Sequence, residues 1–139
     1  MRVPAIAWWP GTVPAGVVRT QLTSNVDLFP TAIALAGGEV PRDRVIDGRN
    51  LVPLLRGESK AEVREFFPYY RTDELYAARL GPWKAHFITR SPYTGQTEAV
   101  EHATPELYNL DVDPSEKYNV AEAHPDVIAA IRRAVAEFQ

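Results

Sequence analysis

The cationic residues best placed to bind an anion lie in the second half of the chain, where the sequence has a strand-like pattern. Lys84 and His86 are two positions apart, so a β-strand would direct both side chains to one face. Its other face would carry the apolar side chains of Trp83, Ala85 and Phe87. Arg71 precedes this stretch as a third candidate. Cationic side chains beside a cleft attract anionic ligands, but a solvated strand face is the alternative interpretation.

Other titratable residues lack the spacing of a catalytic or metal site. His102 and His124 are too far apart in sequence to form a short zinc-binding motif. Asp43 and Asp47 are four apart, but no helix signal holds them on one face. Asp27 is placed to cap a helix, which favours a structural role over a metal ligand or an acid. We assign no catalytic residue and no metal ligand.

Composition is typical of a globular protein and excludes several classes. The 139 residues are 45% hydrophobic and 24% charged, with a net charge of −3 and no cysteine, so thiol chemistry and disulfides are excluded. Lys and Arg are dispersed, unlike a nucleic-acid footprint. No apolar run is long enough to span a membrane. The first residues lack the long apolar region of a signal peptide, which leaves the compartment open.

The first sixty residues predict one buried strand, one helix and a loop. Val3–Trp9 is apolar on both faces, as in a strand inside a covered sheet. A helix is expected from about Leu28 to Ala36, with Asp27 as its N-cap. Asp47–Gly48 predicts a turn, and Leu51–Leu55 a short apolar anchor.

The following stretch is predicted to be rich in β-structure. Residues Ser59–Glu65 are polar and suit a hinge. Phe66–Arg71 predicts one strand, and Leu75–Leu80 with Trp83–Thr89 predicts a hairpin around Gly-Pro. Arg90–Thr104 has no clear period and predicts a long loop.

The stretch Glu106–Val120 predicts a strand that runs into a capped turn. Asp113 and Glu116 have the spacing of a capping box, which predicts a one-turn helix. Asn119 offers a second cap or turn. A last helix is expected from about Pro125, because apolar residues recur on one face and the opposite face is polar.

Four pieces of the chain resemble the sulfatase family, in family order. The pattern Leu-Tyr-x-Leu-x-x-Asp-Pro-x-Glu-x-x-Asn within Glu106–Val120 is similar to a stretch near the C-terminal end of that family. Asp27–Thr31, Asp47–Leu55 and Phe66–Phe87 resemble earlier family stretches. The last is most similar to the branch of arylsulfatase A and N-acetylgalactosamine-6-sulfatase.

The resemblance implies an α/β parent fold of the alkaline-phosphatase type, of which this chain is an α+β part. Residues 1–60 would be the tail of the large domain, with its last strand and helix. Residues 61–139 would be a C-terminal subdomain, in which a small antiparallel sheet is packed by the C-terminal helix.

The resemblance also implies sulfate-ester hydrolysis by the parent enzyme. In the family, a formylglycine made within Cys-x-Pro-Ser-Arg attacks sulfur, and a calcium ion is held by Asp and Asn residues. No position of this chain matches those motifs, which the resemblance places before Val3–Trp9. We therefore expect the C-terminal part of a sulfuric ester hydrolase that lines the cleft for a sulfated small molecule or glycan. As an isolated chain it should be inactive.

Two alternatives stay open. The chain could be a stand-alone noncatalytic module that binds an anionic glycan or a partner subunit, and the exposed face of its large-domain part could serve for association. The parent could instead cleave phosphate or phosphonate esters. The resemblance is compatible with a periplasmic or secreted parent.

Overall fold

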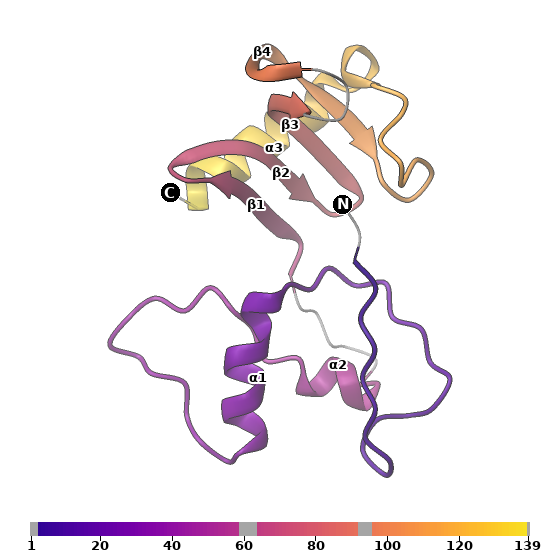
Figure 1. Cartoon of the computed structure of the whole chain (residues 1–139), viewed down its shortest axis with the longest axis vertical. Helices are drawn as coiled ribbons and strands as arrows, with labels where there is room; N and C mark the ends of the chain where they lie inside the picture. The colour runs from indigo at the N-terminus through magenta and orange to yellow at the C-terminus, as the bar shows by residue number, and fades with distance from the viewer. Residues whose placement is uncertain (1–2, 59–63, 92–95, 139) are drawn as a thin grey trace. The chain divides into compact units, whose positions relative to one another are not determined.

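The computed structural model describes residues 3–58, 64–91 and 96–138. The chain divides into two units, Val3–Glu65 and Phe66–Gln139, which are called here the N-terminal and the C-terminal unit. Both are drawn in Figure 1. Most of the predicted hinge Ser59–Glu65 lies outside the described residues.

The C-terminal unit contains a four-stranded antiparallel sheet. Its strands are β1 (Phe66–Arg71), β2 (Glu74–Leu80), β3 (Trp83–Ser91) and β4 (Gln96–Asn109), and they pair in chain order. The hairpin between β2 and β3 turns at Gly81, whose φ of 55° is in the left-handed region that glycine adopts without steric cost. The predicted small antiparallel sheet is therefore confirmed.

Helix α3 (Pro125–Phe138) packs on one face of this sheet (Figure 1). Leu107 of β4 and Ile131 of α3 are completely buried. Each large side chain removed from water in this way contributes about 1.5–3 kcal/mol. The buried cluster consists of Ala78, Ala85, Leu107, Ala121, Ile128 and Ile131. Both the predicted helix and its apolar stripe are confirmed.

The opposite face of the sheet is called here the polar face. The residues of the polar face follow from the register of the strands and from the alternation of side chains along each strand. His86 lies between Ala77 of β2 and Glu106 of β4, and Lys84 pairs with Tyr108 of β4. Tyr69 of β1 lies opposite Ala77 and so belongs to the same face.

The predicted loop over Arg90–Thr104 is wrong. Strand β3 continues to Ser91, and β4 begins at Gln96, with Ile88 opposite Glu101 and Thr89 opposite Val100. Backbone hydrogen bonds to a neighbouring strand hold this ribbon, and they need no apolar period in the sequence. Residues 92–95 lie outside the described part.

The predicted one-turn helix after β4 is also wrong. The amide of Glu116 donates to the carbonyl of Asp113 at 3.2 Å, which closes a turn rather than a helix. The carboxylate of Asp113 accepts from the amides of Lys117 (2.7 Å) and Tyr118 (2.9 Å). Glu116 does not complete a capping box, because its side chain is bonded to the sheet instead.

The N-terminal unit contains a 3₁₀ turn η1 (Asn25–Asp27) and the helices α1 (Leu28–Leu35) and α2 (Val52–Arg56). Helix α1 is the predicted helix. The predicted apolar anchor is α2 with the residue before it, and both Leu51 and Leu54 are buried.

Asp27 stands at the N-cap position of α1, but its side chain does not cap that helix. The buried carboxylate accepts from the backbone amides of Ser24 and Arg49, each at 2.8 Å, and pairs with the guanidinium of Arg64. Asp27 therefore joins the start of α1 to two later segments. The prediction that Asp27 has a structural role is right, but the prediction that its side chain caps α1 is wrong.

Two further predictions for this unit are wrong. Val3–Trp9 forms no strand, and Ile6 and Trp8 are 96% and 84% exposed. Within the described residues of this unit there is no strand with which the segment could pair. Asp47–Gly48 forms no turn either. The segment passes so close to η1 that a Cβ on Gly48 would be 2.1 Å from the carbonyl oxygen of Val26.

Candidate functional site

A carboxylate lies between the two side chains that the sequence placed on one strand face. Lys84 Nζ donates to Glu116 Oε1 at 2.8 Å and to Oε2 at 3.1 Å, and His86 Nε2 is 2.6 Å from Oε2. Because an ionised carboxylate only accepts hydrogen bonds, Nε2 carries the proton. The structure thus brings Lys84 and His86 together on one face as predicted and adds Glu116, whose spacing from Asp113 predicts a helix cap.

Two tyrosine rings flank this cluster on the polar face. The ring centre of Tyr69 is 5.1 Å from Lys84 Nζ, a cation–π contact. The ring of Tyr108 meets the imidazole of His86 edge-on at 5.7 Å between ring centres. The hydroxyl of Tyr108 donates to Glu106 at 3.0 Å. Lys84 is only 6% exposed, so it is not a solvated side chain.

The surroundings shift the pKa of the acid and of both tyrosines. Burial by itself raises the pKa of Glu116, but hydrogen bonds from His86 and Lys84 outweigh it and hold that pKa well below its usual range. Burial, together with the hydrogen bond to Glu106, raises the pKa of Tyr108 to about 12. Burial also raises the pKa of Tyr69. The cluster therefore holds an ionised acid beside two neutral phenols.

Arg71, the third candidate, lies apart from this cluster in the register of the sheet. It is the last residue of β1, opposite Glu74, and follows a register irregularity after Tyr69. Its side chain is exposed, and its guanidinium is 5.9 Å from the ring centre of Tyr76.

The two remaining histidines have structural contacts. His102 Nε2 is 2.8 Å from the hydroxyl of Thr89, and the ring centre of His124 lies 4.8 Å from the ring centre of Trp83.

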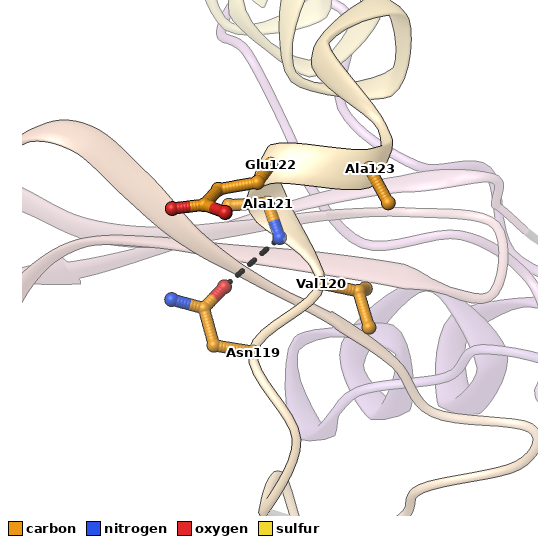
Figure 2. A pocket seen from close by; sticks show the side chains of 5 residues that line it. All are labelled: Asn119, Val120, Ala121, Glu122 and Ala123. Carbon is orange, nitrogen blue, oxygen red and sulfur yellow. Dashed lines mark hydrogen bonds between the residues drawn. The ribbon is translucent and has the colours of Figure 1, made fainter.

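A surface pocket is lined by Asn119–Ala123, just before His124 in the sequence (Figure 2). It presents one amide, one carboxylate and no cation, so it does not suit an anion.

The described residues do not fit the cofactors of the resembled family. Within residues 3–58, 64–91 and 96–138, no three His, Asp or Glu side chains come together as a metal-ligand group. The chain has no cysteine that could become formylglycine. We therefore derive no reaction step through either group.

No helix among the described residues is long and apolar enough to cross a membrane.

Residues 62–139 match the family model for the C-terminal region of aryl-sulfatase. The chain belongs to the sulfatase family. Arylsulfatase D of Homo sapiens is 39% identical over 99% of this chain and 27% of its own length. N-acetylgalactosamine-6-sulfatase of Canis lupus familiaris is 39% identical over 96% of this chain and 29% of its own length. This chain thus spans less than a third of the length of these relatives. The predicted resemblance to the sulfatase family is confirmed.

Solved sulfatase structures share the fold. The PsFucS1 sulfatase from Pseudoalteromonas sp. superposes with a TM-score of 0.83 over 96% of this chain and 28% of its own, at 20% identity. A structure from work on glycosaminoglycan metabolism by Bacteroides thetaiotaomicron gives 0.69 over 94% of this chain and 27% of its own, at 29% identity. The predicted fold class is therefore confirmed.

Proposed function

We propose that this chain completes the fold of a sulfuric ester hydrolase and lines the cleft that receives a sulfated small molecule or glycan. The observation that carries the proposal is the cluster of Lys84 and His86 on the polar face, held by Glu116. The substrate class is supported by curated relatives such as N-acetylgalactosamine-6-sulfatase of Homo sapiens, which is 41% identical over 96% of this chain.

Within this proposal the chain binds and orients the substrate but breaks no bond. The side chain of His86 is 21% exposed and that of Lys84 7%, so His86 is the one that meets the cleft, with Lys84 behind it. Arg71 is exposed at the end of β1, and its pairing with Glu74 and its contact with the ring of Tyr76 place it away from the polar face, so it adds no charge to this cluster. The nucleophile and the calcium ion would come from parts of a sulfatase that this chain does not span.

Residues 1–60 are proposed to be the tail of the large sulfatase domain, and residues 61–139 the C-terminal subdomain. Large apolar side chains that are exposed in the first part support this assignment, because an enzyme would cover such side chains with the rest of its large domain. Ile6 is 96% exposed, Trp8 84%, Leu28 62% and Phe29 52%. These exposed residues would carry the association with the rest of the enzyme.

The first test is activity of the 139-residue chain. We expect no hydrolysis of a chromogenic aryl sulfate, with or without added calcium. Turnover above the blank by pure protein would refute the assignment of bond breaking to other parts of the enzyme.

The second test concerns the cleft. This chain is exchanged for the corresponding region of N-acetylgalactosamine-6-sulfatase, and His86→Ala is introduced in the chimera. We expect KM for a sulfated saccharide to rise with little change in kcat, because His86 is proposed to bind and not to react. His102→Ala, a histidine bonded to Thr89, is the matched control. An unchanged KM in an active chimera would show that His86 does not contact the substrate in the cleft.

Calorimetry with heparin or chondroitin sulfate tests the alternative that the chain is a stand-alone glycan-binding module. Heat of binding by the isolated chain at micromolar ligand would favour that module. We expect no heat even at millimolar ligand.

A further inference from the structure

Residues 110–119 form a strap between β4 and the 3₁₀ turn η3 (Ala121–Ala123), and both of its ends are fixed to the sheet. At the first end, the amide of Leu110 donates to the carbonyl of Pro82 at 2.8 Å. At the second end, Asn119 Oδ1 accepts from the amide of Leu107 at 3.0 Å. The amide of Val120 donates to the carbonyl of Leu107 at 2.9 Å. The middle of the strap must therefore be held separately or remain free to open.

The middle of the strap is held through Glu116. Its carboxylate reaches Lys84 and His86, both on β3, while the turn around it is organised by Asp113. The backbone of Glu116 has φ 54°, a left-handed conformation that is uncommon for residues other than glycine. A strained backbone persists only when surrounding contacts enforce it. The hydrogen bonds of the Glu116 carboxylate to β3 enforce it, together with those that Asp113 accepts from the amides of Lys117 and Tyr118.

We propose that Glu116 is a charge latch that holds the strap closed across the polar face and keeps Lys84 covered. This inference goes beyond the proposed function and does not rest on it. The evidence is the geometry: one carboxylate joins the strap to two side chains of a neighbouring strand, and the adjoining Lys117 and Tyr118 are exposed. Loss of its charge would remove the central attachment and leave the two end attachments in place.

The groups around the latch keep it charged over a wide pH range. The titratable groups on the polar face around it are Lys84 and His86 of β3, Tyr69 of β1, Arg79 of β2, and Glu106 and Tyr108 of β4, with Asp113 in the strap itself. Of these, Lys84 and His86 contact the carboxylate and favour its charged form. The raised pKa of Tyr108 keeps its phenol neutral. The pKa of Glu116 is held below its usual range, so its charge survives at a pH of about 4, where a free glutamate is half protonated.

The test is amide hydrogen exchange of the peptide 110–121 in the full chain, corrected for intrinsic rates, between pH 4 and 8. Wild type should be protected throughout. Glu116→Gln should lose protection by about tenfold or more, since a hydrogen bond to a charged group is lost. Glu116→Gly should lose it too, although glycine relieves the left-handed strain. Asp111→Asn, an exposed carboxylate of the same strap, is the matched control and should keep wild-type protection.

Wild-type protection in either Glu116 variant would overturn the latch. Exchange in the peptide of β2 shows whether a variant has lost its global fold. A second measurement needs no variant: the carboxyl carbon of Glu116, followed by NMR, should not titrate between pH 7 and 4. A midpoint near 4.5, the ordinary glutamate value, would overturn the proposal. Neither readout uses substrate or activity, so each is independent of the proposed function.

Discussion

At the scale of single residues, the chain holds its ionisable groups by pairing them. Lys84 is 6% exposed, and burying an ammonium ion without a partner would be very costly. Glu116 provides that partner, and the cation–π contact with Tyr69 adds a second favourable interaction. The same pairing makes the stability of the C-terminal unit depend on pH in a direction that can be worked out.

Glu116→Gln should destabilise the C-terminal unit by about 1.5–3 kcal/mol at pH 7, because hydrogen bonds to a charged acceptor are lost. The folded pKa of Glu116 lies below its unfolded value of 4.5. Its contribution is therefore fully present above about pH 4.5 and is lost as pH falls toward the folded pKa. The difference between wild type and variant should shrink at pH 3.

The measurement is urea unfolding followed by fluorescence of Trp83, in a background where the exposed Trp8 and Trp9 are replaced by Phe. Trp83 packs against the core of the C-terminal unit and so reports on it. An equal difference at pH 7 and pH 3 would contradict the pairing.

Tyr108 makes a second residue-scale prediction, at alkaline pH. Its folded pKa is raised to about 12 from 10.0, so its contribution is present below about pH 10 and is lost as pH rises toward 12. Tyr108→Phe should remove a tyrosinate that forms near pH 12 in an ultraviolet titration. If the variant retained a phenol ionising near pH 12, the assignment to Tyr108 would be wrong.

At the scale of elements, the position of the site follows from the two faces of one sheet. Helix α3 covers the face with Ala85 and Leu107, so the alternate positions Lys84 and His86 are directed to the polar face. The helix thereby fixes which side of β3 can contact other groups.

Ile131→Ala should destabilise the C-terminal unit by about 2–5 kcal/mol, because the side chain is completely buried between α3 and the sheet. Arg133→Ala, on the exposed face of α3, is the control and should cost less than about 0.5 kcal/mol. Urea unfolding measures both. Equal effects would mean that α3 does not pack as described.

Gly48→Ala tests the close approach of the segment before α2 to η1. The added Cβ would lie 2.1 Å from the carbonyl oxygen of Val26, and backbone must move to admit it. We expect a loss of about 1–3 kcal/mol or more in the N-terminal unit. Gly38→Ala is the control, since its Cβ would be 3.2 Å from the Cγ2 methyl group of Ile33, a much smaller overlap. Thermal unfolding should separate the two variants.

At the scale of the whole molecule, the two units have different surfaces. The C-terminal unit has a core of its own, formed by sheet and helix. The smaller buried cluster of the N-terminal unit centres on Leu51 and Leu54, and many of that unit's large apolar side chains are exposed. A unit that encloses its own core can fold alone.

Residues 66–139 expressed alone should therefore unfold cooperatively in urea, as followed by circular dichroism. Amide exchange of β2 and β3 should match that in the full chain. A broad, noncooperative transition would show that this unit needs residues 3–65.

The sequence by itself determined the repeating elements and the family. Strands β1 to β3 and helices α1 and α3 follow from local periodicity and from turn residues such as Gly81, which act over a few positions. The family follows from motifs such as the one containing Asp113 and Glu116. Lys84 and His86 share a face because alternation along a strand is a local property.

Only the tertiary structure decided which distant groups these residues meet. Glu116 lies 30 positions after His86, and its local spacing matched a cap equally well. The first half of β4 is held by pairing with β3. Val3–Trp9 has the sequence of a strand, but the described residues of its unit contain no strand with which it could pair. Sequence patterns record periodicity along the chain, whereas backbone pairing and charge pairing depend on neighbours that only folding brings together.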